Sequence, residues 1–230
     1  MISSAKPAVQ RSAILRAAIG IGLYAGAFGM AYGAVAIGSG LSVGQTMLLS
    51  LVLFSGGSQF AFAGVIAAGG SGIAAIAAAS LLGARNAFYG VPVSQMLQPK
   101  GWWRRLGTAH FVIDETTAMA VGQPTRPAQR FAFWATGLIL FPLWQLGSLA
   151  GALIGTAIDP ADFGLEAAAP AVFLALLWPR LERWDARLVA LAGAAVALAL
   201  VPVAPAGVPV IAAAAVALVA GLLPRRTTES

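Results

Sequence analysis

Apolar residues fill long stretches of this chain, and short polar or Gly- and Pro-rich segments separate them. No charged residue occurs between positions 17 and 84. Because about 20 apolar residues suffice for a helix to cross a bilayer, this run alone has room for several helices. The stretches are continuous and rich in Ala, Leu and Gly, whereas barrel strands would alternate polar and apolar positions. The pattern predicts an all-α fold, a polytopic integral membrane helical bundle.

Basic residues between the stretches bear on the number of spans, because Lys and Arg concentrate in cytoplasmic loops. Eight full spans would place Lys100, Arg104 and Arg105 outside, and seven would require the basic N-terminus to be outside. Six spans keep every basic loop on one face, provided that one early segment dips in and returns. Six to eight spans with discontinuous helices are therefore predicted. The candidate helices cover residues 17–38, 43–68, 72–96, 107–122, 131–157, 167–178, 188–203 and 208–223.

A single membrane transport domain is expected over residues 17–224, between a cytoplasmic N-terminal segment, 1–16, and a cytoplasmic tail, 225–230. Several glycines stand four positions apart, so each set lines one helix face and allows a neighbouring helix to approach closely. The alternative is that Gly is simply common here, at 27 residues. The sets are Gly22 with Gly26, Gly29 with Gly33, and Gly147, Gly151 and Gly155.

Composition supports lipid as the surroundings of the chain. Hydrophobic residues make up 59% and charged residues 10%, against roughly a quarter charged in a soluble domain. The net charge of +6 does not indicate nucleic-acid binding, because the basic residues are spread over short flanks and not gathered on one soluble face. With no cysteine and one histidine, neither a metal site nor a cofactor is expected. No ATP-binding phosphate loop is present, and the chain is not expected to be an enzyme.

Residues 54–60, Phe-Ser-Gly-Gly-Ser-Gln-Phe, place polar groups in the middle of an apolar stretch. Gly56 and Gly57 loosen the helix, and the side chains of Ser55, Ser58 and Gln59 need partners. A broken helix is expected here, whose unwound backbone holds a zwitterionic substrate and whose half-helix N-terminus favours a carboxylate. The alternative is a Gly-Ser kink with hydroxyls that bond back to the helix.

Arg85 lies deep in the third apolar stretch, followed by Asn86 and, one turn later, by Tyr89. A guanidinium at a membrane helix centre costs roughly 2.5–3.5 kcal/mol on insertion scales, so it should face a partner or a hydrated cavity. In a functional role these residues would bind a substrate carboxylate, or Arg85 would move during gating. The alternatives are a fixed ion pair and a helix end from which the side chain reaches the interface.

His110 and Asp114 are four apart and would share one face of a helix over 107–122, with Glu115 beside them. These two acids are the only ones before Asp159. They can pair with Arg85, or His110 and Asp114 can relay protons in coupling or gating. The alternative is an interfacial amphipathic helix whose polar face is in water.

Four blocks, at residues 54–60, 85–90, 113–118 and 169–173, resemble successive landmarks of the AzlC family in order and spacing. One departure is Gly83, where family members often carry Asn or Asp. The resemblance implies a secondary transporter subunit that exports valine, leucine, isoleucine and analogues across the cell inner (cytoplasmic) membrane, coupled to a gradient. It also implies a small hydrophobic AzlD-type partner subunit. A permease or channel for another small solute is the alternative.

Overall fold

The computed structural model describes residues 7–157, 181–205 and 207–222, together with residues 171, 174, 177 and 178. Every regular element within these residues is helical, which confirms the all-α prediction. The predicted helix at 167–178 lies mostly outside them, and the predicted tail, 225–230, lies entirely outside. Of the predicted N-terminal segment, 1–16, residues 1–6 lie outside and residues 7–16 belong to α1. The helices are α1 (Pro7–Gly38), α2 (Val43–Val52), α3 (Gly56–Ala67), α4 (Gly72–Gly83), α5 (Arg85–Leu97), α6 (Trp102–His110), α7 (Asp114–Val121), α8 (Arg126–Ala157), α10 (Trp184–Leu200) and α11 (Val208–Leu222).

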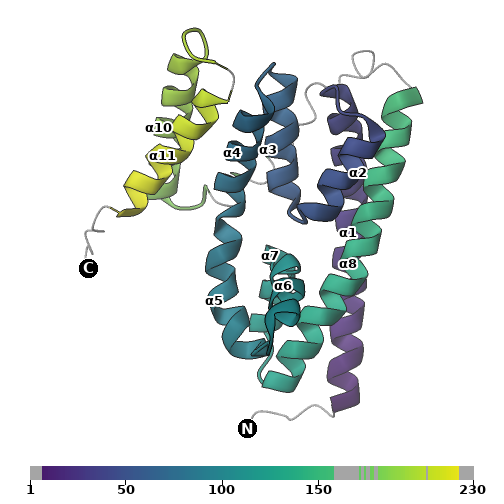
Figure 1. Ribbon diagram of the computed structural model, residues 1–230. Coiled ribbons are helices and arrows are strands. Elements are labelled where there is room, and N and C mark those ends of the chain that lie inside the picture. The colour runs from purple at the N-terminus through teal and green to yellow at the C-terminus, as the bar shows by residue number, and fades with distance from the viewer. Residues whose placement is uncertain are drawn as a thin grey trace.

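Two long helices, α1 and α8, run along the length of the bundle. Each has 32 residues, and both are long and apolar enough to cross a membrane by length and composition. They lie side by side from one end of the bundle to the other (Figure 1). The end at which α1, α6 and α8 begin carries Lys100, Arg104, Arg105 and Arg126 and is called the basic end. The opposite end, where the described α1–α2 and α3–α4 loops contain no charged residue, is called the neutral end.

Glycines bring the backbones of α1 and α8 into direct contact. A Cβ atom on Gly147 would collide with the carbonyl of Gly26, and one on Gly151 would collide with the carbonyl of Met30. From the other helix, a Cβ on Gly33 would collide with the Ser148 carbonyl. The predicted glycine packing faces are therefore confirmed.

Three of the predicted helices are interrupted near the middle of the bundle. The break at residues 53–55, between α2 and α3, was predicted. The predictions of one continuous helix over 72–96 and another over 107–122 are wrong, because each segment forms two helices. Ala84 separates α4 from α5, and residues 111–113 separate α6 from α7. In Figure 1, α2 and α3 form a hairpin that enters from the neutral end and returns, while α6 and α7 form one that enters from the basic end. Together α4 and α5 connect the two ends.

The hydrogen bonds at helix starts explain why these segments begin where they do. Ser42 and Gln45 form a reciprocal capping box at α2, with bonds of 2.8 and 3.2 Å, and Ser71 accepts from the Ala74 N–H at the start of α4. Such caps satisfy N–H groups that a helix leaves without partners. Both α2 and α4, which enter the bundle from the neutral end, thus begin with a serine cap.

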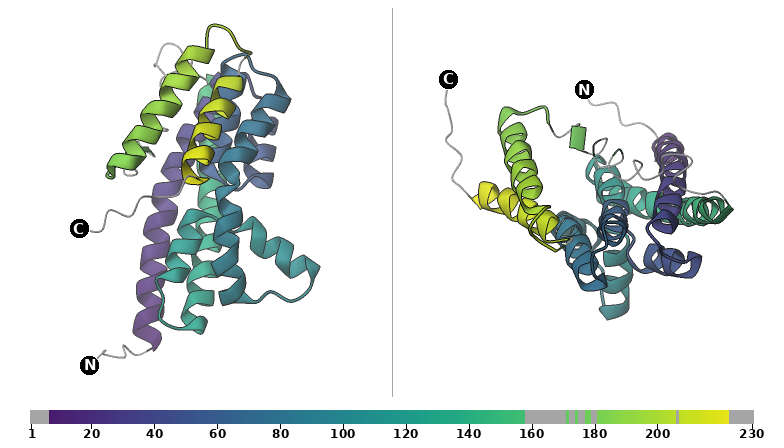
Figure 2. Two further views of the ribbon diagram at one scale, coloured as in Figure 1. Left: turned by 90° about the vertical axis from the view of Figure 1, so that its left-hand side faces the viewer. Right: turned by 90° about the horizontal axis from the view of Figure 1, so that it is seen from above.

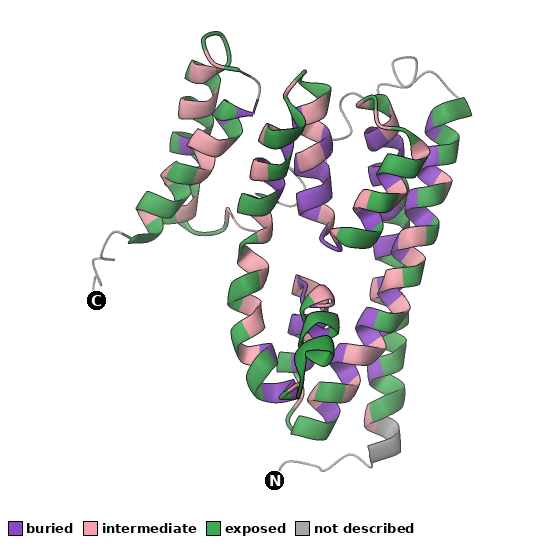
Figure 3. Ribbon diagram, viewed as in Figure 1, coloured by how far each residue is buried: buried purple, intermediate pink, exposed green. Residues whose placement is uncertain are grey.

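The pair α10 and α11 packs along α4, away from α1 and α8 (Figure 2). Buried positions concentrate where α1, α3 and α8 face one another, and the outer surfaces are exposed (Figure 3). Many exposed side chains are large and apolar, such as Ile73, Phe88 and Leu222, at 82%, 76% and 84% exposure. A continuous apolar exterior of this kind suits contact with lipid.

Candidate functional site

Arg85 lies where the three helix breaks meet. It is the first residue of α5, and its Nη1 atom lies 3.4 Å from Oδ2 of Asp114, the first residue of α7. Its Nη2 atom lies 3.2 Å from the position that a Cβ on Gly57 would occupy, in the first turn of α3. The structure therefore brings together Arg85, Gly57 and Asp114, three candidates from separate segments, and gathers the N-termini of α3, α5 and α7 around one guanidinium.

The helix N-termini make the surroundings of Arg85 electropositive. The first N–H groups of a helix have no partner within it, and the helix dipole adds partial positive charge there. No side chain caps α3 or α5, and neither has an acidic residue in its first turn. In contrast, α7 begins with Asp114 and Glu115, and Glu115 interacts electrostatically with both Asp114 and Arg85. The junction thus combines a positive side with two carboxylates opposite it.

Unpaired polar atoms remain at the start of α5. The Arg85 Nε donor and the Asn86 Oδ1 acceptor are buried, and neither has a hydrogen-bond partner within the described residues. A buried polar atom without a partner costs about 1–3 kcal/mol. The Arg85 and Asp114 side chains are themselves 33% and 37% exposed. The ion pair is therefore partly accessible, while two polar atoms beside it are buried without partners in the described part of the chain.

The serine hydroxyls face the break between α4 and α5. Ser58 donates to the Ser55 Oγ at 3.2 Å, and both residues are buried. A Cβ on Gly83 would stand 3.1 Å from the Ser58 Oγ, so the missing side chain at Gly83 leaves the room that this hydroxyl occupies. Since Ser58 donates to Ser55 and not to a helix carbonyl, the arrangement differs from the simple Gly-Ser kink.

Gln59 ties the first break to α8. Its side chain is fully buried, its Nε2 donates to the Leu53 carbonyl at 2.5 Å, and its Oε1 accepts from Trp144 Nε1 at 3.1 Å. The Trp144 ring also covers Gly56, where a Cβ would stand 2.8 Å from the ring. In this arrangement the Gln59 amide fixes the unwound backbone that was predicted to hold substrate.

Replacing Trp144 with phenylalanine should lower the stability of the chain by about 1 kcal/mol, because the buried Gln59 Oε1 would lose its donor. The measurement is the melting temperature of the purified protein in detergent. The matched control is Trp103→Phe, since Trp103 is 80% exposed and should melt like the unmodified chain. Equal melting of the two variants would show that the Gln59–Trp144 bond contributes nothing.

His110 and Asp114 do not share a helix face, which corrects the sequence-based expectation. His110 ends α6 and Asp114 begins α7, because the chain turns at residues 111–113. There the Thr116 hydroxyl accepts from the Ile113 N–H at 3.2 Å and donates to the Phe111 carbonyl at 2.6 Å. Asp114 pairs with Arg85, which was the other expectation, and Glu115 lies beside them.

The tips of the two hairpins meet through aromatic rings. Phe54 stacks on His110 with ring centres 5.8 Å apart and contacts Phe111 edge-on, also at 5.8 Å. Phe141 of α8 contacts the same Phe54 ring at 4.9 Å. Tyr89 is half-buried and packs, like Phe111, against the buried cluster that contains Val93. An apolar cluster of rings therefore lies at the first break, next to the buried Ser55.

The family described as "AzlC protein" matches residues 20–158, more than half of the sequence. The chain belongs to the AzlC family. The AzlC match contains all three helix breaks and the whole Arg85 junction. AzlC membership makes this a chain of membrane-transport type and not of a known enzyme family.

Two relatives of this AzlC-family chain are named "Uncharacterized membrane protein", and both come from Helicobacter pylori. The one from strain ATCC 700392 / 26695 is 24% identical over 157 residues, which are 67% of this chain and 68% of the relative. The one from strain J99 / ATCC 700824 is 25% identical over 171 residues, 74% of this chain and 75% of the relative. No solved structure matches the chain. Family, relatives and apolar helices together indicate a membrane location.

The buried hydroxyl groups on α2 and α8 were not predicted from the sequence. Thr46, Ser50 and Ser148 are fully buried, and their hydroxyls have no hydrogen-bond partner within the described residues. Gln145 donates to the Ser50 carbonyl at 3.2 Å. The signal was present, because Thr46 and Ser50 stand four apart on one helix face. In this AzlC-family chain, polar groups therefore extend along α2 from the first break toward the neutral end.

Proposed function

We propose that this chain is the large subunit of a secondary transporter that exports branched-chain amino acids across the cytoplasmic membrane. Transport is coupled to an ion gradient, and a small AzlD-type membrane subunit completes the transporter. The observation that carries the proposal is the convergence of three interrupted helices on Arg85, with Gly57 and Asp114 on either side. Discontinuous helices whose N-termini point at an anionic group are a recurring design of transporter substrate sites.

The two charged ends of an amino acid fit the two sides of the junction. The carboxylate is stabilised by Arg85 and by the uncapped N-termini of α3 and α5. The ammonium group is stabilised by Asp114 and Glu115 and by the carbonyl ends of the preceding half-helices. The aliphatic side chain then lies toward Phe54 and the neighbouring rings, where burial of each CH₂ group contributes about 0.8 kcal/mol.

Binding of a zwitterion replaces the ion pair between Arg85 and Asp114 with two ion pairs, one at each of these residues. The zwitterion separates Arg85 from Asp114 and pairs with each of them, so the buried junction keeps its net charge throughout. Because an unpaired buried charge is costly, a ligand that carries only one of the two charges leaves one side of the junction without a partner. The proposal therefore predicts selection for zwitterions.

Leucine analogues with one charged group removed should compete poorly for transport. 4-Methylpentanoate is leucine without the ammonium group and isopentylamine is leucine without the carboxylate, so we expect each to inhibit leucine export roughly 100-fold less well than valine, since sites built for polar groups reject analogues without them. The measurement is inhibition of labelled leucine flux in proteoliposomes. Inhibition by either analogue at the concentration effective for valine would contradict the two-sided site.

The transport activity itself is tested in cells loaded with a leucine-containing dipeptide. Deletion of the chain should slow leucine efflux, and the chain expressed with its small partner should restore it. Unchanged efflux in the deletion strain, with no other exporter induced, would overturn the substrate assignment. Proteoliposomes that hold both subunits test coupling: leucine release should respond to an imposed proton or sodium gradient. Release that ignores both gradients would favour the passive channel.

A further inference from the structure

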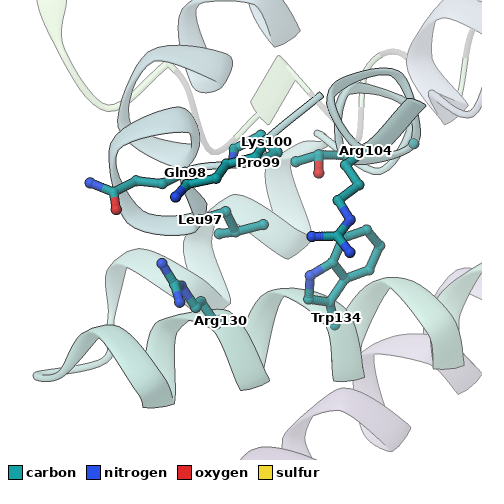
Figure 4. Close-up of a pocket in the computed structure, with 9 residues that line it drawn as sticks. Leu97, Gln98, Pro99, Lys100, Arg104, Arg130 and Trp134 are labelled. Carbon is teal, nitrogen blue, oxygen red and sulfur yellow. The ribbon is translucent and has the colours of Figure 1, made fainter. Parts of the chain in front are cut away.

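A second site lies at the basic end, away from the Arg85 junction. A cavity of about 620 Å³ opens where α5 ends and α6 and α8 begin. Three cations from three different segments line it: Lys100 follows α5, Arg104 lies on α6 and Arg130 lies on α8. Trp134 and Thr108 add an aromatic face and a hydroxyl. Figure 4 shows the Arg104 side chain extending toward Trp134, while Arg130 rises from α8 toward the end of α5.

The cations of this cavity have no acidic counterpart. None of the lining residues is acidic, and the ion pairs within the described residues are Arg85 with Asp114 and Arg183 with Asp185. Arg130 is oriented by its Nε, which donates to the Met96 carbonyl at 3.2 Å near the end of α5. Its two terminal nitrogens therefore stay available for a ligand. Such a concave surface with three positive charges attracts an anion.

The neighbouring surface indicates that lipid headgroups surround the cavity. Trp102 and Trp103 begin α6 and are 71% and 80% exposed, and Leu106, one turn on, is half exposed. Tryptophans are enriched at the level of the headgroups, where one side of the ring meets apolar chains and the other meets water. Arg104 follows them directly on α6 and lines the cavity. Basic pockets between membrane helices on the cytoplasmic side are a chemistry suited to anionic lipids.

We propose that this cavity binds the phosphate group of an anionic phospholipid. The Arg104 and Arg130 guanidiniums donate paired hydrogen bonds to the phosphate oxygens, a geometry that guanidinium favours. Lys100 adds a third positive charge, and the acyl chains extend along the apolar exterior beside Leu106. A bound lipid connects α5, α6 and α8. Of these helices, α5 follows the second break, at Ala84, and α6 precedes the third break, at residues 111–113.

The test measures lipid binding directly, without a transport assay. Purified full-length chain in a neutral detergent is titrated with phosphatidylglycerol or phosphatidylcholine, and bound lipid is counted by native mass spectrometry. Phosphatidylglycerol should bind at least about tenfold more tightly than phosphatidylcholine. Glycerol phosphate and inorganic phosphate are added as soluble competitors, and each should displace phosphatidylglycerol only weakly. Tight binding of inorganic phosphate without preference for phosphatidylglycerol would overturn the lipid assignment.

Matched variants separate the cavity from the general charge of the basic end. The double variant Arg104→Gln and Arg130→Gln should lose about tenfold in phosphatidylglycerol affinity. The control, Arg16→Gln and Arg126→Gln, removes the same charge from two exposed positions on α1 and α8 that do not line the cavity, and should bind normally. Lys100→Gln, a single change in a loop, should weaken binding severalfold and serves if the double variant does not fold. Equal losses in the cavity and control variants would overturn the proposal.

Discussion

Alanine at Gly151 should prevent this chain from accumulating as a folded protein, whereas alanine at Gly20 should leave its level unchanged or raise it. The added methyl at Gly151 meets the backbone carbonyl of Met30, which no rotamer change can move, so α1 and α8 must separate along their length. Overpacking of this kind costs about 3 kcal/mol or more. Gly20 has open space at its Cβ position, and there alanine gains up to about 1 kcal/mol of helix propensity.

The measurement is the fluorescence size-exclusion profile of tagged chain extracted in mild detergent. Gly151→Ala should give aggregate or no peak, and Gly20→Ala a symmetric peak. Gly33→Ala repeats the test from the other helix, because its methyl would meet the Ser148 carbonyl. A normal peak for both Gly151→Ala and Gly33→Ala would show that α1 and α8 do not pack through these glycines.

The glycine faces and the first helix break were predictable because their causes are local. Glycines four apart have a direct geometric consequence on a helix, and the pair Gly56 and Gly57 weakens a helix in any setting. The break at Ala84 has no such signal. Its backbone angles, φ −57° and ψ −26°, stay within the helical region, so a small local change separates α4 from α5. The flanking contacts with Gly57 and Asp114 accompany the break, and they belong to the tertiary structure.

The third break was hidden by an apolar sequence, Phe111-Val112-Ile113, that reads equally well as helix. Ile113 is extended, at φ −132° and ψ 172°, and Thr116 satisfies the backbone groups that the break exposes. The scarcity of acids did identify Asp114 as a partner for Arg85. It could not show that a turn would separate Asp114 from His110, because that depends on the stacking of His110 on Phe54 across two hairpins.

The hydrogen bond of Trp144 could not be predicted from the sequence for a different reason. A single tryptophan in an apolar helix is ordinary, and nothing near it in the chain indicates that its ring nitrogen donates to Gln59, 85 positions away. The buried hydroxyls of Thr46 and Ser50 were recognisable as a polar face, but their relation to α8 was not. Residue types and spacing therefore predicted Arg85, Gly57 and Asp114 as candidates, whereas their convergence and the pairing of their neighbours required the packed helices.

Replacing Arg85 with glutamine should reduce leucine export roughly 100-fold while the protein still folds. The substrate carboxylate would lose its charged partner. Because the Arg85 and Asp114 side chains are 33% and 37% exposed, we expect a cost of about 3 kcal/mol, in the lower part of the range for buried charge pairs, where each 1.4 kcal/mol is a factor of ten. The measurement is the initial rate of labelled leucine flux in proteoliposomes, normalised to folded protein. Arg126→Gln is the control, since Arg126 lies at the basic end, away from the junction, and should transport normally.

A double variant separates substrate binding from a purely structural ion pair. If Arg85 only neutralises Asp114, then Arg85→Gln combined with Asp114→Asn should restore transport, because both charges of the pair are removed together. If Arg85 and Asp114 each hold one end of a zwitterion, the double variant should regain stability relative to Arg85→Gln, since the partly buried Asp114 carboxylate is no longer left without its partner, and transport should stay at or below the level of Arg85→Gln. Recovery of leucine flux in the double variant would rule out the proposed role of Arg85 in binding the carboxylate.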